Sequence, residues 1–275
     1  MKFEIGERSF GNERCWLMGV VNVTPDSFSD GGAFLDAESA IAHGIELVAQ
    51  GAHVLDVGGE STRPGAAPVS VDEEIARVVP VIAGLKNSVD VPISIDTTKA
   101  SVAHAACCAG AQMVNDVSGL TFDEKMAAVV AEAHASLCVM HIQGTPETMQ
   151  NAPLYENVCD EVAQSLLASV GRAERAGVAA DRIIVDPGIG FGKELQHNLD
   201  LINGCSTLEK LVGRPVLMGV SRKSFIGQLT GQPVHNRLHG TSSAVAACVL
   251  HGARMVRIHD VEAMRDVVLV AQALR

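Results

Sequence analysis

The chain has 275 residues, of which 47% are hydrophobic and 19% charged, and this composition excludes an intrinsically disordered protein. Its 21 lysines and arginines against 32 aspartates and glutamates give a formal net charge of −11, which opposes binding to nucleic acid or to an anionic membrane. Aromatic residues make up 3% of the chain, too few for a base-stacking surface. We therefore expect neither nucleic acid nor a membrane as a partner.

The N-terminal segment and the cysteines indicate the cellular compartment. Charged side chains at Lys2, Glu4, Glu7 and Arg8 interrupt the first ten residues, so this segment lacks the apolar run of a signal peptide. No apolar stretch reaches the roughly 18 residues that a membrane span needs. The seven cysteines show no metal-ligand spacing, which predicts reduced thiols that are mostly buried. A cytoplasmic protein is predicted.

Short apolar runs alternate along the chain with longer segments of helical periodicity. Several of the runs are apolar almost throughout, which is typical of parallel strands covered on both faces. No Pro/Ser-rich or low-complexity linker interrupts the series, so we expect one domain over residues 1–275. The predicted strands are 16–21, 53–57, 91–95, 112–115, 137–140, 182–185, 215–220 and 254–258.

A helix is predicted after each strand, at 37–50, 71–85, 101–109, 123–133, 157–176, 197–211, 238–250 and 262–274. Glycines that suit helix C-caps follow four of these helices: Gly51, Gly110, Gly177 and Gly252. Eight strand-then-helix units over a length near the ~250 residues typical of this fold predict an α/β single-domain (β/α)8 TIM barrel. An open doubly wound sheet is the alternative that the same alternation permits.

Polar residues follow the apolar runs. They are Asn22, Asp56, Asp96, Asn115, Asp116, His141, Asp186, Lys223, Arg257 and His259. Taken singly, each is better explained as a helix N-cap or turn residue. Capping does not explain His, Lys and Arg, because the helix macrodipole disfavours cations at N-termini. In a barrel these positions converge on the C-terminal mouth, where we expect an active site.

Two chemical sets stand out among the polar residues. The first suits the donor-rich edge of a flat heterocycle and comprises Asp96, Asn115, Asp186 and Lys223. The second suits a phosphate or diphosphate and comprises Asn22, Arg63, Arg257 and His259. Two long Gly/Pro/Ser-rich loops, 22–32 and 58–66, are candidate lids or binding loops. A substrate with a ring at one end and phosphate at the other fits both sets.

Eight motifs resemble, in order, those of the dihydropteroate synthase family of folate biosynthesis. They are MGVVNVTPDSFSDGG from Met18, DVGGESTRPGA from Asp56, ISIDTTKA from Ile93, VNDVSG from Val114, VMHIQGTP from Val139, VDPGIGFGK from Val185, GVSRKSFIG from Gly219 and VRIHDV from Val256. The resemblance implies a (β/α)8 barrel that joins p-aminobenzoate to 6-hydroxymethyl-7,8-dihydropterin diphosphate. The products would be 7,8-dihydropteroate and pyrophosphate, and relatives are typically homodimers.

The resemblance also implies residue roles. Asp96, Asn115, Asp186 and Lys223 would hold the pterin, and Arg257 would stack on the ring and reach the diphosphate. Asn22 would bind Mg²⁺, with Arg63 and His259 on the anionic oxygens. The p-aminobenzoate site would comprise Phe28, Thr62, Arg63, Pro64, Phe191, Lys223 and Ser224. The residues expected to act in catalysis are Asp96, Lys223, Arg63 and Arg257.

Two other functions are compatible with a pterin-binding barrel. One is methyl transfer from methyltetrahydrofolate to a corrinoid, against which the STRPG and SRKS motifs count. The other is a carrier or catalytically silent subunit that only binds a pterin. The presence of Asn22, Arg63 and Lys223 counts against this last function.

Overall fold

The computed structural model describes residues 2–23, 32–61, 68–145, 148–150 and 152–275, with the backbone alone for residues 32–36. Eight parallel strands form one sheet in the order β8-β7-β6-β5-β4-β3-β10-β9. A parallel bridge between Val185 and Val216 joins β8 to the residue before β9 and closes the barrel. The strands are β3 (Trp16–Asn22), β4 (Val54–Gly58), β5 (Ile93–Asp96), β6 (Met113–Asp116), β7 (Ser136–Met140), β8 (Ile183–Asp186), β9 (Leu217–Met218) and β10 (Met255–Ile258).

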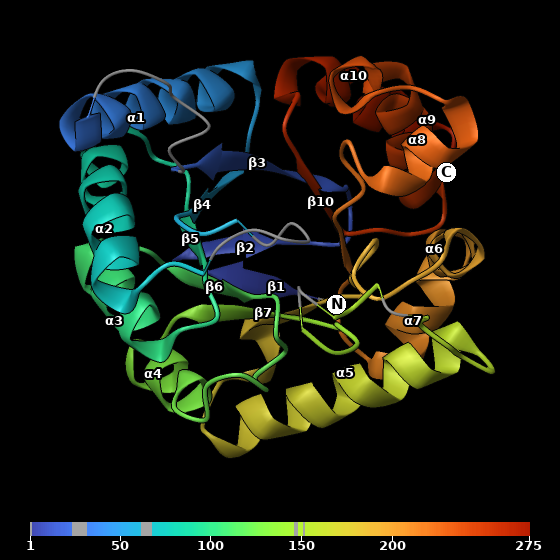
Figure 1. The fold of residues 1–275 in the computed structure, drawn as a ribbon, viewed down its shortest axis with the longest axis horizontal. Coiled ribbons are helices and arrows are strands. Elements are labelled where there is room, and N and C mark those ends of the chain that lie inside the picture. The colour runs from blue at the N-terminus through green and yellow to red at the C-terminus, as the bar shows by residue number, and fades with distance from the viewer. Residues whose placement is uncertain (1, 24–31, 62–67, 146–147, 151) are drawn as a thin grey trace.

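Helices surround the barrel on its outside (Figure 1). They are α1 (Gly32–Gln50), α2 (Val71–Ser88), α3 (Ala100–Ala109), α4 (Met126–Glu132), α5 (Val158–Arg175), α6 (Leu195–Asn203), α7 (Cys205–Val212), α8 (Ser224–Thr230), α9 (Leu238–Leu250) and α10 (Val261–Ala273). Short 3-10 turns lie at Ala180–Arg182 and Val234–Asn236. The predicted closed barrel is confirmed, and the open-sheet alternative is wrong.

Several element bounds differ from the predicted ranges, and three of the differences change an element substantially. The single helix expected at 197–211 is two helices that meet at Gly204. A Cβ atom at Gly204 would lie 2.7 Å from Cys159 Sγ and 2.9 Å from the Asp200 carbonyl oxygen, so only glycine fits this close approach to α5. The strand expected at 215–220 contains only Leu217 and Met218, and a turn follows in which Lys223 N donates to the Val220 carbonyl oxygen. Helix α8 is additional to the eight that were predicted.

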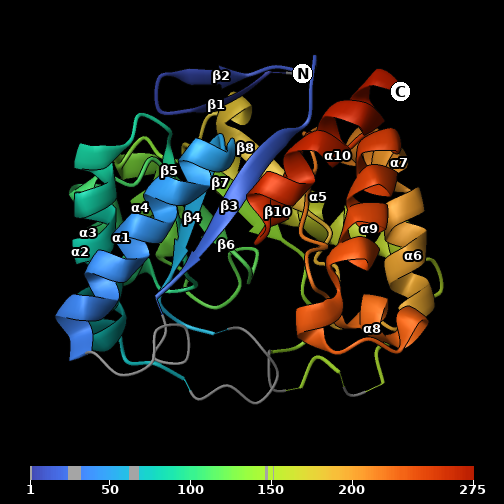
Figure 2. The same ribbon diagram turned by 90° about the horizontal axis from the view of Figure 1, so that it is seen from above.

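A short antiparallel hairpin, which the sequence analysis did not predict, covers the N-terminal end of the barrel (Figure 2). Its strands are β1 (Phe3–Ile5) and β2 (Arg8–Phe10). The apolar side chains of the hairpin pack in one cluster with inward-facing residues of the barrel: Trp16, Met18, Val54, Met113, Cys138, Ile184, Leu217 and Met255. This cluster fills the lower half of the barrel and leaves its polar end on the opposite side.

The positions of the polar side chains follow from the two-residue alternation of a strand. A residue two positions beyond an inward-facing apolar residue also faces the interior, one layer nearer the C-terminal mouth. Four polar residues have this relation to the apolar cluster: Asp56 after Val54, Asn115 after Met113, Asp186 after Ile184 and Arg257 after Met255. The strand register therefore places them together above the apolar layer.

The seven cysteines are free thiols. Cys15, Cys138, Cys205 and Cys248 are buried, whereas Cys108 is exposed. Burial raises the pKa of Cys15 and of Cys205 to about 12, which keeps both thiols protonated. The expectation of buried, unreactive thiols thus fits these core positions and does not fit Cys108.

We expect Phe10→Ala to destabilise the barrel, because Phe10 is 5% exposed and its ring centroid lies 4.9 Å from that of Trp16. Removing a buried aromatic ring typically lowers the free energy of unfolding by about 3–5 kcal/mol. Phe122→Ala is the matched control, because Phe122 is 44% exposed, and its effect should stay within about 0.5 kcal/mol. Urea unfolding of both variants tests this, and equal losses would contradict a plug role for the hairpin.

Candidate active site

A pocket opens at the C-terminal mouth of the barrel. Its lining residues come from the ends of six strands and from the loops that follow them: Asp96, Asn115, Val117, Met140, Asp186, Ile189, Phe191, Gly219, Ser221, Lys223, Arg257 and His259. Seven of these were predicted site residues, namely Asp96, Asn115, Asp186, Phe191, Lys223, Arg257 and His259. The structure therefore brings the whole predicted pterin set, and Arg257 and His259 of the anion set, into one cavity.

Arg257 on β10 reaches two carboxylates on neighbouring strands. Its Nε atom lies 2.5 Å from Asp56 Oδ2, and one terminal nitrogen lies 2.7 Å from Asp96 Oδ2. Asn115 Nδ2 donates to the same Asp56 oxygen at 3.1 Å, which orients the Asn115 amide. Asp56 thus organises the floor of the pocket, although it does not line it.

The role of Asp56 was missed at the level of sequence. Asp56 was placed among the strand-end polar residues, and no function was assigned to it. It is fully buried, and its Oδ1 atom has no hydrogen-bond partner among the described residues. The signal that could have identified it is its alternation with the inward-facing Val54, which it shares with the residues that were assigned a site.

Burial and charge set the titration of the two pocket carboxyls. Burial raises the pKa of Asp96 to about 7, with Arg257 acting in the opposite direction and Asp56 in the same direction as burial. Burial also raises the pKa of Asp186. A 2.7 Å hydrogen bond from the Gly188 backbone nitrogen and the nearby charge of Lys223 both act to lower this pKa, but burial has the larger effect. Asp96 therefore titrates close to neutral pH.

Lys223 and Phe191 form one wall of the pocket. The Lys223 Nζ atom lies 4.1 Å from the centroid of the Phe191 ring, a cation–π contact. Phe191 sits between Gly190 and Gly192, which have φ of +81° and +63°. A Cβ at Gly188, earlier in the same turn, would lie 2.0 Å from the His141 carbonyl oxygen, so this tight turn requires glycine.

Two of the strand-end polar residues, His141 and Asp116, do not line the pocket and make structural contacts. His141 Nδ1 lies 2.9 Å from the buried Lys193 Nζ, which also donates to the Phe191 carbonyl oxygen. Burial lowers the pKa of Lys193 to about 7 and that of His141 to about 3. Asp116 accepts hydrogen bonds from Ser118 N, Ser118 Oγ and Leu120 N, so turn capping explains it.

His259, after β10, is held by Ser221, which follows the neighbouring strand β9. The His259 backbone nitrogen donates to Ser221 Oγ at 3.2 Å, and His259 Nδ1 lies 2.9 Å from the same oxygen. Burial, together with the nearby charge of Arg257, lowers the pKa of His259 to about 3. His259 is therefore neutral at physiological pH and can meet an anion as an N–H donor, with Arg257 supplying the positive charge.

Several predicted residues are not placed in the pocket. Phe28, Thr62, Arg63 and Pro64, with most of the loops 22–32 and 58–66, lie outside the described residues. Asn22 is half-buried at the end of β3, and Ser224 is exposed at the start of α8; neither lines the cavity. The roles given to these six residues stay predictions.

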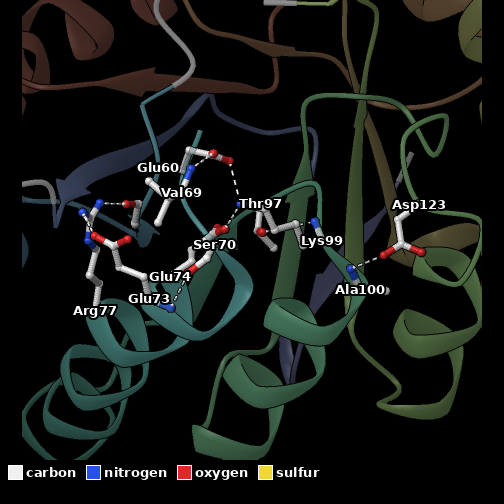
Figure 3. Close-up of polar contacts among 11 residues, drawn as sticks. Glu60, Val69, Ser70, Glu73, Glu74, Arg77, Thr97, Lys99, Ala100 and Asp123 are labelled. Carbon is white, nitrogen blue, oxygen red and sulfur yellow. Dashed lines mark hydrogen bonds and ion pairs between the residues drawn. The ribbon is translucent and has the colours of Figure 1, made fainter. Parts of the chain in front are cut away.

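A partly buried ion-pair network joins the segments that follow β4 and β5 (Figure 3). Lys99 Nζ is 2.9 Å from Glu60 Oε2 and 2.5 Å from Glu74 Oε2. The second Glu60 oxygen accepts a hydrogen bond of 2.7 Å from Val69 N. Glu60 therefore links residue 69 to the residues that follow Asp96 on β5.

A closed eight-stranded barrel with a mixed-charge pocket at its C-terminal mouth defines the class of protein. The family of pterin binding enzymes matches residues 18–259 of the chain. This match covers seven strands of the barrel in full and β3 from Met18 onward. The chain is thus a barrel enzyme of the pterin-binding class.

Individual relatives narrow the class. The chain is 46% identical over 272 residues to the dihydropteroate synthase of Synechocystis sp., covering 98% of this chain and 94% of that protein. The Escherichia coli enzyme is 41% identical over 257 residues, with coverage of 94% and 90%. The chain belongs to the dihydropteroate synthase family.

Solved structures of the same family superpose closely. Xanthomonas albilineans dihydropteroate synthase with 4-aminobenzoic acid is 42% identical, with a TM-score of 0.92 and coverage of 99% and 97%. The Yersinia pestis enzyme, solved in complex with a sulfonamide drug, is 37% identical, with a TM-score of 0.93 and coverage of 100% and 99%. The fold implied by the sequence motifs is confirmed by this agreement.

The raised pKa of Asp96 predicts a pH-dependent contribution to stability. The folded-state pKa of about 7 exceeds the unfolded value of 3.8, so at pH 5 the folded protein retains a proton that the unfolded chain has lost. The stabilising contribution is complete below pH 3.8 and is lost as the pH rises through 7. The stability advantage of the wild type over Asp96→Asn should therefore shrink from pH 4 to pH 8. Urea unfolding across this range measures it, and a constant difference would contradict the assignment.

We expect Lys99→Met to be strongly destabilising, because it leaves the fully buried Glu74 carboxylate without its cation. Breaking a buried ion pair from one side costs about 3–5 kcal/mol of unfolding free energy. Adding Glu74→Gln should restore part of the loss. Arg265→Met is the control, because its pair with Asp266 is exposed and should contribute at most about 1 kcal/mol. If Lys99→Met and Arg265→Met lower the free energy of unfolding by similar amounts, burial of the Glu74 carboxylate does not determine the strength of its ion pair.

Proposed function

We propose that the chain is a dihydropteroate synthase that condenses 6-hydroxymethyl-7,8-dihydropterin diphosphate with p-aminobenzoate, forming 7,8-dihydropteroate and pyrophosphate in folate biosynthesis. The observation that carries this proposal is the convergence of Asp96, Asn115, Asp186 and Lys223 with Arg257 in one pocket. Relatives solved with 4-aminobenzoic acid and with 7,8-dihydropteroate support it. The reaction is a transfer of an alkyl group from diphosphate to an aromatic amine.

The pterin would bind against the acceptor-rich floor of the pocket. The ring presents several N–H donors along one edge, and carboxyl and amide groups supply acceptors for them. Asn115 is already oriented by Asp56, and Asp186 by the Gly188 amide. This preorganisation spares the cost of ordering these two groups when the substrate arrives.

Displacement of diphosphate by an aromatic amine needs stabilisation of the leaving group more than it needs a strong base. A neutral aromatic amine is already nucleophilic, and electron release from the dihydropterin ring favours departure of diphosphate before the new C–N bond forms. Arg257 would bind the departing anion, assisted by His259 and by Arg63. The carboxylates of Asp96 and Asp186 would stabilise the positive charge that develops near the ring.

The p-aminobenzoate would lie against Phe191 and Lys223 at the open side of the pocket. The cation–π contact between these two residues keeps the ammonium close to an aromatic face, which suits a ring that carries a carboxylate. We assign the rest of this site to Phe28, Thr62, Arg63, Pro64 and Ser224. These assignments rest on the family motifs.

The residues present fit a magnesium ion that arrives with the diphosphate. Among the residues that the structure describes, no group of three or more His, Cys, Asp or Glu side chains is placed to hold a metal ion. Asn22 offers one amide oxygen at the end of β3, and Mg²⁺ characteristically combines few protein ligands with substrate phosphates and water. Bound there, the ion would neutralise charge on the leaving diphosphate.

The cellular setting completes the proposal. Across the described parts of the chain, no helix combines the length and the apolar character that a bilayer crossing needs. We propose a cytoplasmic homodimer: the free cysteines favour a reducing compartment, and the family resemblance favours the dimer. Both statements are open to direct measurement by fractionation and by sedimentation.

An assay of pyrophosphate release tests the function directly. Release should require the pterin diphosphate and p-aminobenzoate together, and it should be abolished by a chelator and restored by added Mg²⁺. The chelator should leave the affinity for free pterin unchanged, because the metal acts on the diphosphate. Release without p-aminobenzoate, or methyl transfer from methyltetrahydrofolate to a corrinoid, would contradict the proposal. Full activity in excess chelator would exclude the magnesium role.

Lys223→Ala should weaken the binding of both substrates, because the ammonium lies where the two parts of the pocket meet. We expect at least a fivefold loss for each, about 1 kcal/mol. Lys125→Ala is the control, because Lys125 is exposed at the start of α4. Titration calorimetry with a pterin and with p-aminobenzoate measures the losses, and affinities unchanged within about twofold would refute this placement.

A further inference from the structure

The residue before Lys223 has an unusual backbone conformation. Arg222 has φ of +58°, in the left-handed region that side-chain-bearing residues rarely adopt. Within the described chain, three other non-glycine residues share this property: Leu120, His134 and Ala152. Of the four, Arg222 alone is adjacent in sequence to residues that line the pocket on both sides, Ser221 and Lys223.

The Arg222 side chain pairs with a residue on the neighbouring strand exit. Its Nε lies 3.0 Å from Asp260 Oδ2, and a terminal nitrogen lies 2.5 Å from Asp260 Oδ1, a two-point contact. Asp260 directly follows His259. The Ser221–His259 hydrogen bond and the Arg222–Asp260 ion pair therefore join successive residues of the two segments that follow β9 and β10.

The backbone of the turn is fixed from two more directions. The Arg222 amide donates to Thr241 Oγ1 on α9 at 3.1 Å. A terminal nitrogen of Arg237 donates to the Arg222 carbonyl oxygen at 3.0 Å and to that of Lys223 at 3.3 Å. Both peptide groups that flank the left-handed residue are thus held by side chains from outside the turn.

This arrangement has no evident purpose in stability. The side chains of Arg222 and Asp260 are 41% and 24% exposed, and ion pairs at such positions contribute little to folding. The left-handed conformation of Arg222 destabilises the folded state by at least as much free energy as such an exposed ion pair contributes. What the contacts do accomplish is geometric, because they set the direction in which the chain leaves β9 and therefore where Lys223 lies.

We propose that Arg222 and Asp260 are a positioning pair, which holds the strained turn so that Lys223 stays over Phe191 and His259 stays against Ser221. This inference rests on the proposed function. Arg222 acts through its neighbour, and it is not a group that contacts substrate. A misplacement of about 1 Å at a reacting group can cost on the order of 10²-fold in rate, so a modest relaxation of the turn is expected to be visible in turnover.

Arg222→Gly separates strain from position, because glycine accepts the left-handed conformation and removes the ion pair. We expect it to unfold no earlier than the wild type and to lower kcat/KM by on the order of tenfold to a hundredfold. His134→Gly is the matched control: His134 has φ of +50°, is exposed, and lies before β7 at the opposite end of the barrel. It should relieve similar strain and leave kcat/KM unchanged. Full activity of Arg222→Gly would overturn the proposal.

A double-mutant cycle tests whether the two residues act as one unit. Arg222→Ala and Asp260→Ala should each lower kcat/KM. The kcat/KM of the double variant should be no lower than that of the less active single variant. Losses that multiply would show that Arg222 acts independently of Asp260 and would overturn the pair. Arg222→Lys should recover only part of the activity, since an ammonium cannot reproduce the two-point contact.

Nuclear magnetic resonance of selectively labelled lysine gives a readout that does not depend on the reaction. The Phe191 ring should shift the Lys223 Cε proton signals upfield, and Phe191→Leu identifies these signals by abolishing the shift. The shift should be reduced in Arg222→Gly and in Asp260→Ala and unchanged in His134→Gly. A retained shift in both pair variants would overturn the positioning role. Failure of the wild type to release pyrophosphate would instead count against the proposed function and leave this measurement intact.

Discussion

The polar end of the barrel depends on one half-buried cation, Arg257, that is shared by two carboxylates. Arg257 binds both Asp56 and Asp96, and Asp56 in turn orients Asn115, so a single guanidinium offsets charge from β4 and β5 and aligns a group on β6. Without it, two carboxylates would lie buried without a counter-ion, which is far more costly than an exposed unpaired charge. One side chain thus makes the pocket compatible with folding and equips it for an anionic substrate.

This polar layer is supported by an apolar layer directly beneath it. The hairpin β1–β2 closes the lower end, where Phe3, Ile5 and Phe10 pack with the inward-facing residues of the strands. Inside the barrel, apolar packing therefore occupies one end and the polar groups the other, while a larger apolar core joins the strands to the surrounding helices. The division is consistent with the general behaviour of these barrels, in which loops at the C-terminal end vary while the base supplies the core.

The architecture was predictable from sequence because apolar runs, terminal glycines and polar strand ends repeat with the period of one unit. The misses have physical causes. Strands of three residues leave too short a pattern to detect, so the hairpin was not predicted. The break at Gly204 follows from contact with α5, which no local pattern reports. The roles of Asp56 and Arg222 depend on partners about 40 to 200 positions away, as Arg222 with Asp260 and Asp56 with Arg257 show.

The short strand β9 has a mechanical consequence. Two residues pair it with β10, and the Val185–Val216 bridge joins it to β8, so the circumference of the barrel has a seam at this point. Asp186 is the last residue of β8, on one side of the seam, and Lys223 lies in the segment that follows β9, on the other side. A ligand that spans these two residues supplies lateral connections that the short strand lacks. In the proposed function, a pterin bound to both residues would connect the two sides of the seam and would therefore stabilise the folded barrel.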